Sequence, residues 1–232
     1  MSSDSYIPNE EIQVVDSATR ARVFLNKVYM WLAVCMLLTA GVAAYAAQDI
    51  ESLLWVGEHR LLVCLSTLGI VVAMSFWANR MTVGALTLLL LVFAGLQGLL
   101  FGPVLICYGL DSVGKAFGCT AVMFGAMSIY GMVTKRNLST WGRMLFMLLI
   151  GLLVAILVNI FWQNNMFDFA ISCAGVVIFS LFTAYDTQNL LKIGLSNDAE
   201  IKKKAVILGA LNLYLDFINL FVMLLHFFNR SE

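Results

Sequence analysis

Charged residues are scarce in this chain. Of its 232 residues 12% are charged and 61% are hydrophobic, whereas soluble globular domains carry about 25% charged residues. This composition excludes an ordinary soluble domain and indicates a protein that is built for lipid. The net charge is zero, so the overall charge points to no acidic or basic partner, and we expect no nucleic-acid partner.

Sequence signatures of enzymes and metal sites are missing as well. The chain has no nucleotide-binding loop, no hydrolase elbow and no zinc signature, and its five cysteines never form a C-x-x-C pair. We interpret the cysteines as small hydrophobic residues rather than disulfide partners or metal ligands. The N-terminus lacks the pattern of a cleaved signal peptide, so the first membrane helix should direct insertion. We expect neither enzymatic activity nor a resident cofactor.

Long apolar runs dominate what is present. A helix needs about 20 apolar residues to cross ~30 Å of hydrocarbon. We predict an all-α membrane protein with seven transmembrane helices, in which a polar cytoplasmic segment, residues 1–24, precedes one membrane domain, residues 25–232. The seven runs cover residues 28–47, 61–78, 83–106, 113–133, 144–162, 169–190 and 206–228.

The distribution of basic residues predicts the orientation. With seven spans, eleven of the fourteen lysines and arginines fall on the side of the N-terminus and three on the other side. Because cytoplasmic loops are enriched in Lys and Arg, the N-terminus is expected in the cytoplasm.

Asp216 stands near the middle of the last apolar run. A charged side chain at this depth costs roughly 3 kcal/mol on insertion scales, so such residues usually face a bundle interior or a wet cavity. On a helix, Asn212, Asp216 and Asn219 share one face. The alternative is that these polar groups only bridge helices, since intramembrane hydrogen bonds average about 0.6 kcal/mol.

A second acidic residue, Asp186, lies near the end of the sixth run. Thr183 shares its helical face, and Asn189 follows one turn later. The short connection to the last run allows the two helices to pack as antiparallel neighbours. Counting residues from the cytoplasmic boundary predicts a difference in depth of roughly 5 to 12 Å between the two carboxyls.

Glycines spaced four residues apart favour close helix packing in two places. Gly98 and Gly102 form such a pair in the third run, and Gly114, Gly118 and Gly125 share one face of the fourth. We interpret both sets as tight packing surfaces between neighbouring helices.

Residues 179–188, which contain Tyr185-Asp186, and residues 210–221, which end Leu215-Asp216-Phe217-Ile218-Asn219-Leu220-Phe221, resemble the last two membrane helices of the Bax inhibitor-1 (transmembrane Bax inhibitor motif) family. The compact chain is most similar to bacterial members, which implies a location in the bacterial inner membrane. The resemblance also implies a bundle in which span 7 is central and the other six spans wrap it as two groups of three.

The resemblance further implies a pH-sensitive calcium leak with Asp186 and Asp216 as proton sensor and transient Ca²⁺ ligands. Calcium prefers six to eight oxygen ligands. The two carboxylates offer up to four oxygens, and Asn212, Asn219 and water help to complete the set. Thr183 and Asn189 are further supporting polar residues of the pair. Arg80, at the cytoplasmic end of span 2, is the candidate for a latch that pairs with Asp186.

Other functions make different demands on the last span. An intramembrane aspartyl protease needs Gly-x-Gly-Asp where this chain has Leu213-Tyr214-Leu215-Asp216, and a retinal protein needs a lysine that span 7 lacks. The remaining alternative is a regulator that transports nothing and instead binds another membrane protein, such as a membrane-bound protease. If the chain is a calcium leak, membrane lipids, Ca²⁺ and protons are its expected partners.

Overall fold

The chain is helical throughout the part that the computed structural model describes, which is the backbone of residues 9–196 and 198–229 and the side chains from residue 19 on, except residue 199. The expected all-α architecture is confirmed for these residues. Of the polar segment predicted for residues 1–24, the first eight lie outside the described residues, and the rest belongs to the first helix. The helices are α1 (Asn9–Gln48), α2 (Ile50–Trp77), α3 (Val83–Val133), a short 3₁₀ helix (Leu138–Thr140), α4 (Trp141–Trp162), α5 (Asn165–Gly194) and α6 (Ala199–Asn229).

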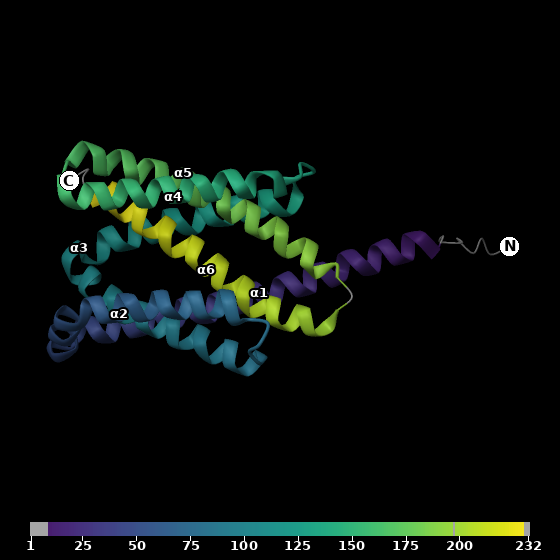
Figure 1. Ribbon diagram of the computed structural model, residues 1–232, viewed down its shortest axis with the longest axis horizontal. Helices are drawn as coiled ribbons and strands as arrows, with labels where there is room; N and C mark the ends of the chain where they lie inside the picture. Colours follow the sequence, from purple (N-terminus) through teal and green to yellow (C-terminus); the bar gives the residue numbers. More distant parts are fainter. Residues whose placement is uncertain (1–8, 197, 230–232) are drawn as a thin grey trace.

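Six helices in the described part of the chain are long and apolar enough to cross a membrane. The sequence predicts seven because α3, with 51 residues, contains two of the expected apolar runs. Gly109 interrupts the helical backbone of α3 with φ 73° and ψ 154°, a conformation that suits glycine because it has no Cβ. Figure 1 shows α3 reversing its direction near its label.

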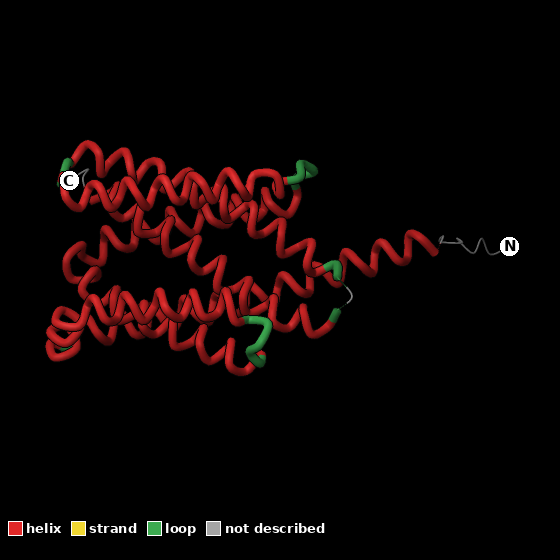
Figure 2. The backbone as a smooth tube through the Cα atoms, viewed as in Figure 1, coloured by secondary structure: helices red, strands yellow, loops and turns green. Residues whose placement is uncertain are grey.

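The helices form two groups with α6 between them. Figures 1 and 2 show α1, α2 and the first part of α3 on one side, α4 and α5 on the other, and α6 running diagonally across the gap. α6 packs against α1, α3 and α5. It is also the most buried helix: 67% of its most apolar stretch is buried, compared with 11–39% in the others.

Glycines allow close approach at some of the expected places. A Cβ on Gly98 would lie 2.7 Å from the Val42 Cβ, and one on Gly102 would lie 2.8 Å from the Ala46 Cβ, so the first part of α3 packs tightly on α1 as predicted. The prediction for the fourth run is wrong: Gly114, Gly118 and Gly125 have no neighbouring atom within 4 Å of such a Cβ.

In the second part of α3 the close contact is instead made by Gly131, which lies directly against the backbone of Ala184 on α5. The error has a simple cause, since spacing places glycines on a common face but does not say which face meets a neighbour. All five cysteines are free, as expected.

Polar residues cap the helices where the chain turns. Asp49 precedes α2, and its carboxylate accepts hydrogen bonds from the backbone N–H and the hydroxyl of Ser52; these bonds lower the pKa of Asp49. Asn164 caps α5 by accepting from the backbone N–H groups of Met166 and Phe167, at 2.9 and 3.1 Å. Both caps satisfy helix N–H groups that have no partner within the helix.

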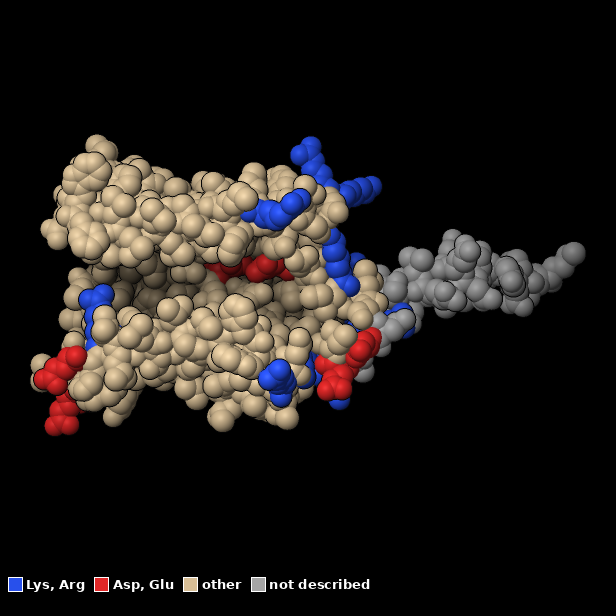
Figure 3. Space-filling model, viewed as in Figure 1, with Lys and Arg blue, Asp and Glu red and all other residues tan. Residues whose placement is uncertain are grey.

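Most of the visible lysine and arginine side chains gather at the end of the bundle from which the N-terminal part of α1 emerges (Figure 3). We call this the basic end. It carries the turn between α2 and α3, the turn between α3 and α4, and the connection between α5 and α6, in agreement with the loop charges that the sequence places on the side of the N-terminus.

Candidate functional site

Asp216 is buried in the bundle, as the sequence predicts for a carboxyl at this depth. Its side chain is 6% exposed. Its Oδ2 atom lies out of contact with solvent and has no hydrogen-bond partner among the described residues. Because a buried polar group without a partner costs about 1–3 kcal/mol, and more when it is charged, this arrangement needs an explanation beyond helix packing.

The acidic group that acts on Asp216 is Asp186, which lies close enough for the two charges to interact. α5 and α6 are antiparallel neighbours in register, because Leu190 packs at Gly209 and Met223 packs at Gly175. Asp216 follows Gly209 by seven residues, so it lies level with Thr183, which precedes Leu190 by seven.

Asp186 therefore lies only three residues nearer the basic end than Asp216, which is about 4.5 Å along the helix axis. This places the pair at the lower limit of the separation expected from the sequence. Figure 3 shows a hollow between the two helix groups with acidic side chains on its floor. Asp186 is half-buried and Asp216 is buried, so solvent reaches the outer member of the pair first.

Two serines that the sequence reading missed lie at nearly the same level. The hydroxyl oxygens of Ser128 on α3 and Ser180 on α5 are buried without a hydrogen-bond partner. Ser128 precedes Gly131 by three residues and Ser180 precedes Ala184 by four, and Gly131 touches Ala184. Both hydroxyls thus lie within about one turn of the level of Asp216. Their spacing in the sequence carries no signal, because the match arises only from the packing of α3 on α5.

The supporting polar residues are divided between core and surface. Thr183 is fully buried, and its hydroxyl donates to the carbonyl oxygen of Phe179 at 2.9 Å. Asn189 and Asn219 are half-buried, whereas Asn212 is exposed. Thr183 thus lies level with Asp216 with its hydroxyl engaged, and Asn212 lies outside the core.

Arg80 does not form the expected latch in this structure. Its side chain is exposed in the turn between α2 and α3, and its guanidinium makes neither a hydrogen bond nor an ion pair with any described residue. Lysines make the polar contacts of this end instead: Lys204 donates to the Asn79 carbonyl oxygen at 3.1 Å, and Lys192 donates to Asn137 and Ser139 at 2.7 and 2.6 Å.

Gln188 holds the turn between α3 and α4 beside the acidic pair. Its Oε1 accepts the backbone N–H of Leu138, and its Nε2 donates to the carbonyl oxygen of Arg136, both at 2.8 Å. Gln188 lies two residues beyond Asp186 on α5, so movement of this part of the helix would also move the turn. The sequence gives glutamine no distinguishing pattern here, and the residue was missed.

A second buried polar contact joins α6 to α1 and α3. The Tyr214 hydroxyl lies 2.7 Å from the Thr39 hydroxyl, which donates to the carbonyl oxygen of Ala94 at 2.9 Å. Tyr214 is fully buried and packs edge-on against Phe93, with ring centroids 5.5 Å apart. This contact fixes α6 against α1 and α3 two residues before Asp216.

Among the described residues, no three His, Cys, Asp or Glu side chains come together as a metal site. Asp186 and Asp216 are a pair without a third such ligand among the described residues. Hydroxyl and carbonyl oxygens and water are the remaining ligands that a hard cation accepts.

Comparison with known proteins identifies the family of the chain. Residues 21–232 match the family described as "Inhibitor of apoptosis-promoting Bax1". "Inner membrane protein YbhL" of Escherichia coli (strain K12) is 40% identical over 225 residues, which cover 94% of this chain and 96% of the relative. A protein of Deinococcus radiodurans is 40% identical over 214 residues, 92% of this chain and 93% of the relative.

A protein of Borreliella burgdorferi is 37% identical over 215 residues, 90% of this chain and 92% of the relative. These relatives, together with the six apolar helices, confirm the expected multi-pass protein of the bacterial inner membrane. The family match covers both carboxyls and, apart from the first twelve residues of α1, the helices of the described chain. The chain belongs to the Bax inhibitor-1 family.

Proposed function

We propose that this protein is a pH-sensitive calcium (cation) leak channel that is gated by the intramembrane pair Asp186 and Asp216. The observation that carries the proposal is the buried Asp216 oxygen without a partner, close to a second carboxyl. A carboxyl that only held helices together should have a hydrogen-bond donor on a neighbouring helix.

The proposal includes a topology of seven crossings around a central α6. A straight helix of 51 residues is about 77 Å long, more than twice the ~30 Å of hydrocarbon. We therefore take the break at Gly109 as a hairpin at the outer surface, with α3 crossing twice. The basic end then faces the cytoplasm, and the acidic pair lies on the cytoplasmic side of the membrane.

Electrostatics accounts for the switch. Two carboxylates this close in a poorly solvated site repel each other strongly when both are ionised, so the pair holds either a proton or a cation. Protons and Ca²⁺ then compete for one site. A change in its occupancy alters the force between α5 and α6, and with it the hollow that leads to the pair.

The test is a flux assay on purified protein in liposomes with an entrapped Ca²⁺ indicator, at pH 6, 7 and 8. We expect the wild-type rate to change at least threefold over this range. Asp216→Asn keeps the size of the side chain but removes its charge and its titration, so the pH dependence of the flux rate should change. Asp186→Asn should have the same effect, because either change leaves a single carboxyl.

Asp168→Asn is the matched control, since Asp168 lies on the same helix as Asp186. Its Oδ1 accepts a hydrogen bond from the Asn159 side chain at 3.3 Å near the other end of α5. This variant should keep the wild-type pH profile. A folded Asp216→Asn protein with an unchanged profile would remove the pair from the gate.

The second candidate is a regulator of another membrane protein, and one observation supports it. Gly114, Gly118 and Gly125 on α3 have open space around them, so a foreign helix has room to pack there. Wild-type protein that is correctly folded but carries no Ca²⁺ at any pH would favour this function. Loss of partner binding in Gly118→Leu would then support it further.

A further inference from the structure

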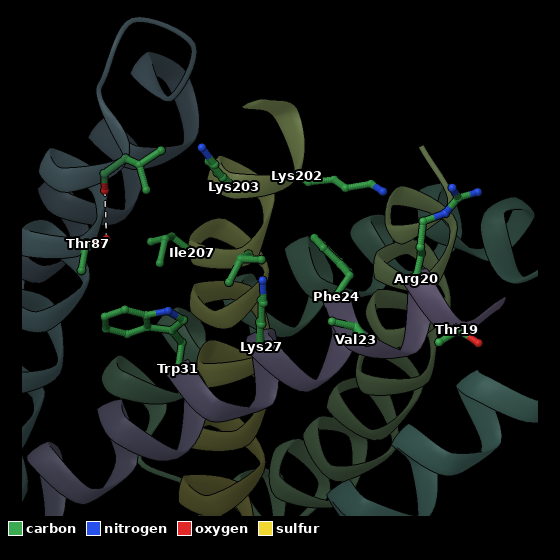
Figure 4. A pocket seen from close by; sticks show the side chains of 12 residues that line it. Thr19, Arg20, Val23, Phe24, Lys27, Trp31, Thr87, Lys202, Lys203 and Ile207 are labelled. Atoms are coloured by element: carbon green, nitrogen blue, oxygen red, sulfur yellow. Dashed lines mark hydrogen bonds between the residues drawn. The ribbon is translucent and has the colours of Figure 1, made fainter. Parts of the chain in front are cut away.

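A cavity of about 540 Å³ opens at the basic end between α1, α3 and α6 (Figure 4). Neither carboxyl of the proposed gate lines it, so it is a separate site. Four of its lining residues are cationic. They are Arg20, Lys27, Lys202 and Lys203.

The cations come from two helices and line one opening. Figure 4 shows the Lys27 side chain rising between Trp31 and Phe24 toward the part of α6 that carries Lys202 and Lys203. Lys27 and Trp31 are four residues apart on α1, so they share a face, and both line the cavity. A cationic and an aromatic side chain of α1 thus line the cavity together.

Below the charges the wall is apolar. Ile207 follows Lys203 by four residues on α6, one turn further into the bundle, and Val83 faces the cavity from α3. Thr87 adds little polarity, because its hydroxyl donates to the Val83 carbonyl oxygen at 2.9 Å (Figure 4). The cavity therefore has a cationic mouth and an apolar interior. Val23, Phe24 and Val206 complete the apolar wall.

The positive charge of the three lysines at the mouth is not neutralised by the described residues. None of the side chains that line the cavity is acidic. Lys27, Lys202 and Lys203 form no ion pair with a described residue. Lys204, the next residue on α6, instead donates to the Asn79 carbonyl oxygen and so ties α6 to the turn between α2 and α3. Cations held this close repel one another unless an anion lies between them.

We propose that this cavity binds an anionic phospholipid of the cytoplasmic leaflet. Lys27, Lys202 and Lys203 contact the phosphate, and the acyl chain runs along the apolar wall past Trp31. Basic pockets between membrane helices on the cytoplasmic side suit such headgroups, and the lysine stems cover apolar surface while the ammonium groups remain in the polar layer. A soluble phosphate would leave the apolar wall without a ligand.

The test measures lipid binding directly, so its outcome is independent of ion flux. Delipidated protein in detergent is titrated with phosphatidylglycerol or phosphatidylcholine that carries brominated acyl chains. Quenching of Trp31 is obtained as the difference between the wild type and Trp31→Phe. We expect phosphatidylglycerol to bind at least tenfold more tightly than phosphatidylcholine. Lys27→Gln with Lys203→Gln should weaken it roughly 30-fold, about fivefold per lysine.

Two further variants separate the site from general charge and from misfolding. Lys135→Gln with Arg143→Gln removes the same charge from exposed residues of the basic end outside the cavity, and it should leave the affinity unchanged. Lys27→Arg with Lys203→Arg should stay within threefold of the wild type. An intact preference for phosphatidylglycerol in the double glutamine variant, or equal losses in the control, overturns the proposal. Glycerol phosphate that competes as well as the lipid overturns it in favour of a soluble anion.

Discussion

Exchanging single glycines of α3 for alanine tests the packing of α3 against α1 most sharply. Gly98 lies against α1, where a new Cβ would be 2.7 Å from the Val42 Cβ and 2.8 Å from the Thr39 carbonyl oxygen. Gly95, three residues earlier on the same helix, has no atom within 4 Å of the same position. The two substitutions are chemically identical, so only the packing differs.

The expected effects have opposite signs. Alanine is favoured over glycine inside a helix by roughly 0.5–1 kcal/mol, so Gly95→Ala should be neutral or stabilising. At Gly98 the new carbon would lie about 1 Å inside the usual 3.5–4.0 Å contact distance, and the Thr39 carbonyl belongs to the backbone and cannot rotate away. Overpacking of this kind costs about 1–3 kcal/mol, which leaves a net loss of about 1–2 kcal/mol.

Thermal unfolding of the purified variants in one detergent measures the difference. The propensity gain is the same for both variants, so the gap between them is the overpacking cost of about 1–3 kcal/mol, which corresponds to roughly 2–12 °C in Tm for a chain of this size. Gly98→Ala should therefore melt at least about 2 °C below Gly95→Ala. Equal melting temperatures would show that α1 and α3 are not in close contact at Gly98, and the arrangement of that helix group would have to be revised.

Three further changes test the polar contacts. Tyr214→Phe removes the hydrogen bond to Thr39 and should cost about 0.5–1.5 kcal/mol in unfolding experiments, with no effect on the pH profile of flux. Gln188→Ala frees the turn that begins at Leu138, so limited proteolysis should cut there several times faster than in the wild type. Ser180→Ala deletes a buried hydroxyl without a partner, so Tm should stay constant or rise; a fall would show that the hydroxyl has a partner, such as a water molecule.

The sequence predicts the membrane helices well because their length and apolarity are set by the bilayer. Its seven predicted apolar runs fall, to within one residue, inside the six observed helices. It also predicts the burial of Asp216, since a carboxyl at that depth usually faces the interior of a bundle. It also predicts that Gly98 and Gly102 pack closely, which the structure confirms. These properties depend on the membrane or on the helix to which the residue belongs.

Properties that depend on which helices meet could not be predicted. Ser128 and Ser180 lie at one level only because Gly131 packs on Ala184. Gln188 matters because a distant turn folds back onto α5. The short connection between the two apolar runs of α3 was missed for a related reason, since the conformation of a single glycine, Gly109, reverses the chain without a loop.

The contrast among buried polar groups favours a gate over simple helix bridging. The Tyr214 hydroxyl has Thr39 as its partner, and Asp168 accepts from Asn159, so these two polar groups are satisfied where neighbouring helices meet. At Asp216 the neighbour is another acid, which destabilises the ionised pair instead of stabilising it. Packing alone gives no reason to keep two acids together, because burying Leu or Asn at these positions would cost less free energy than burying two carboxyls. The arrangement becomes useful when a proton or a cation enters between them, and this is the occupancy that the flux assay with Asp216→Asn measures.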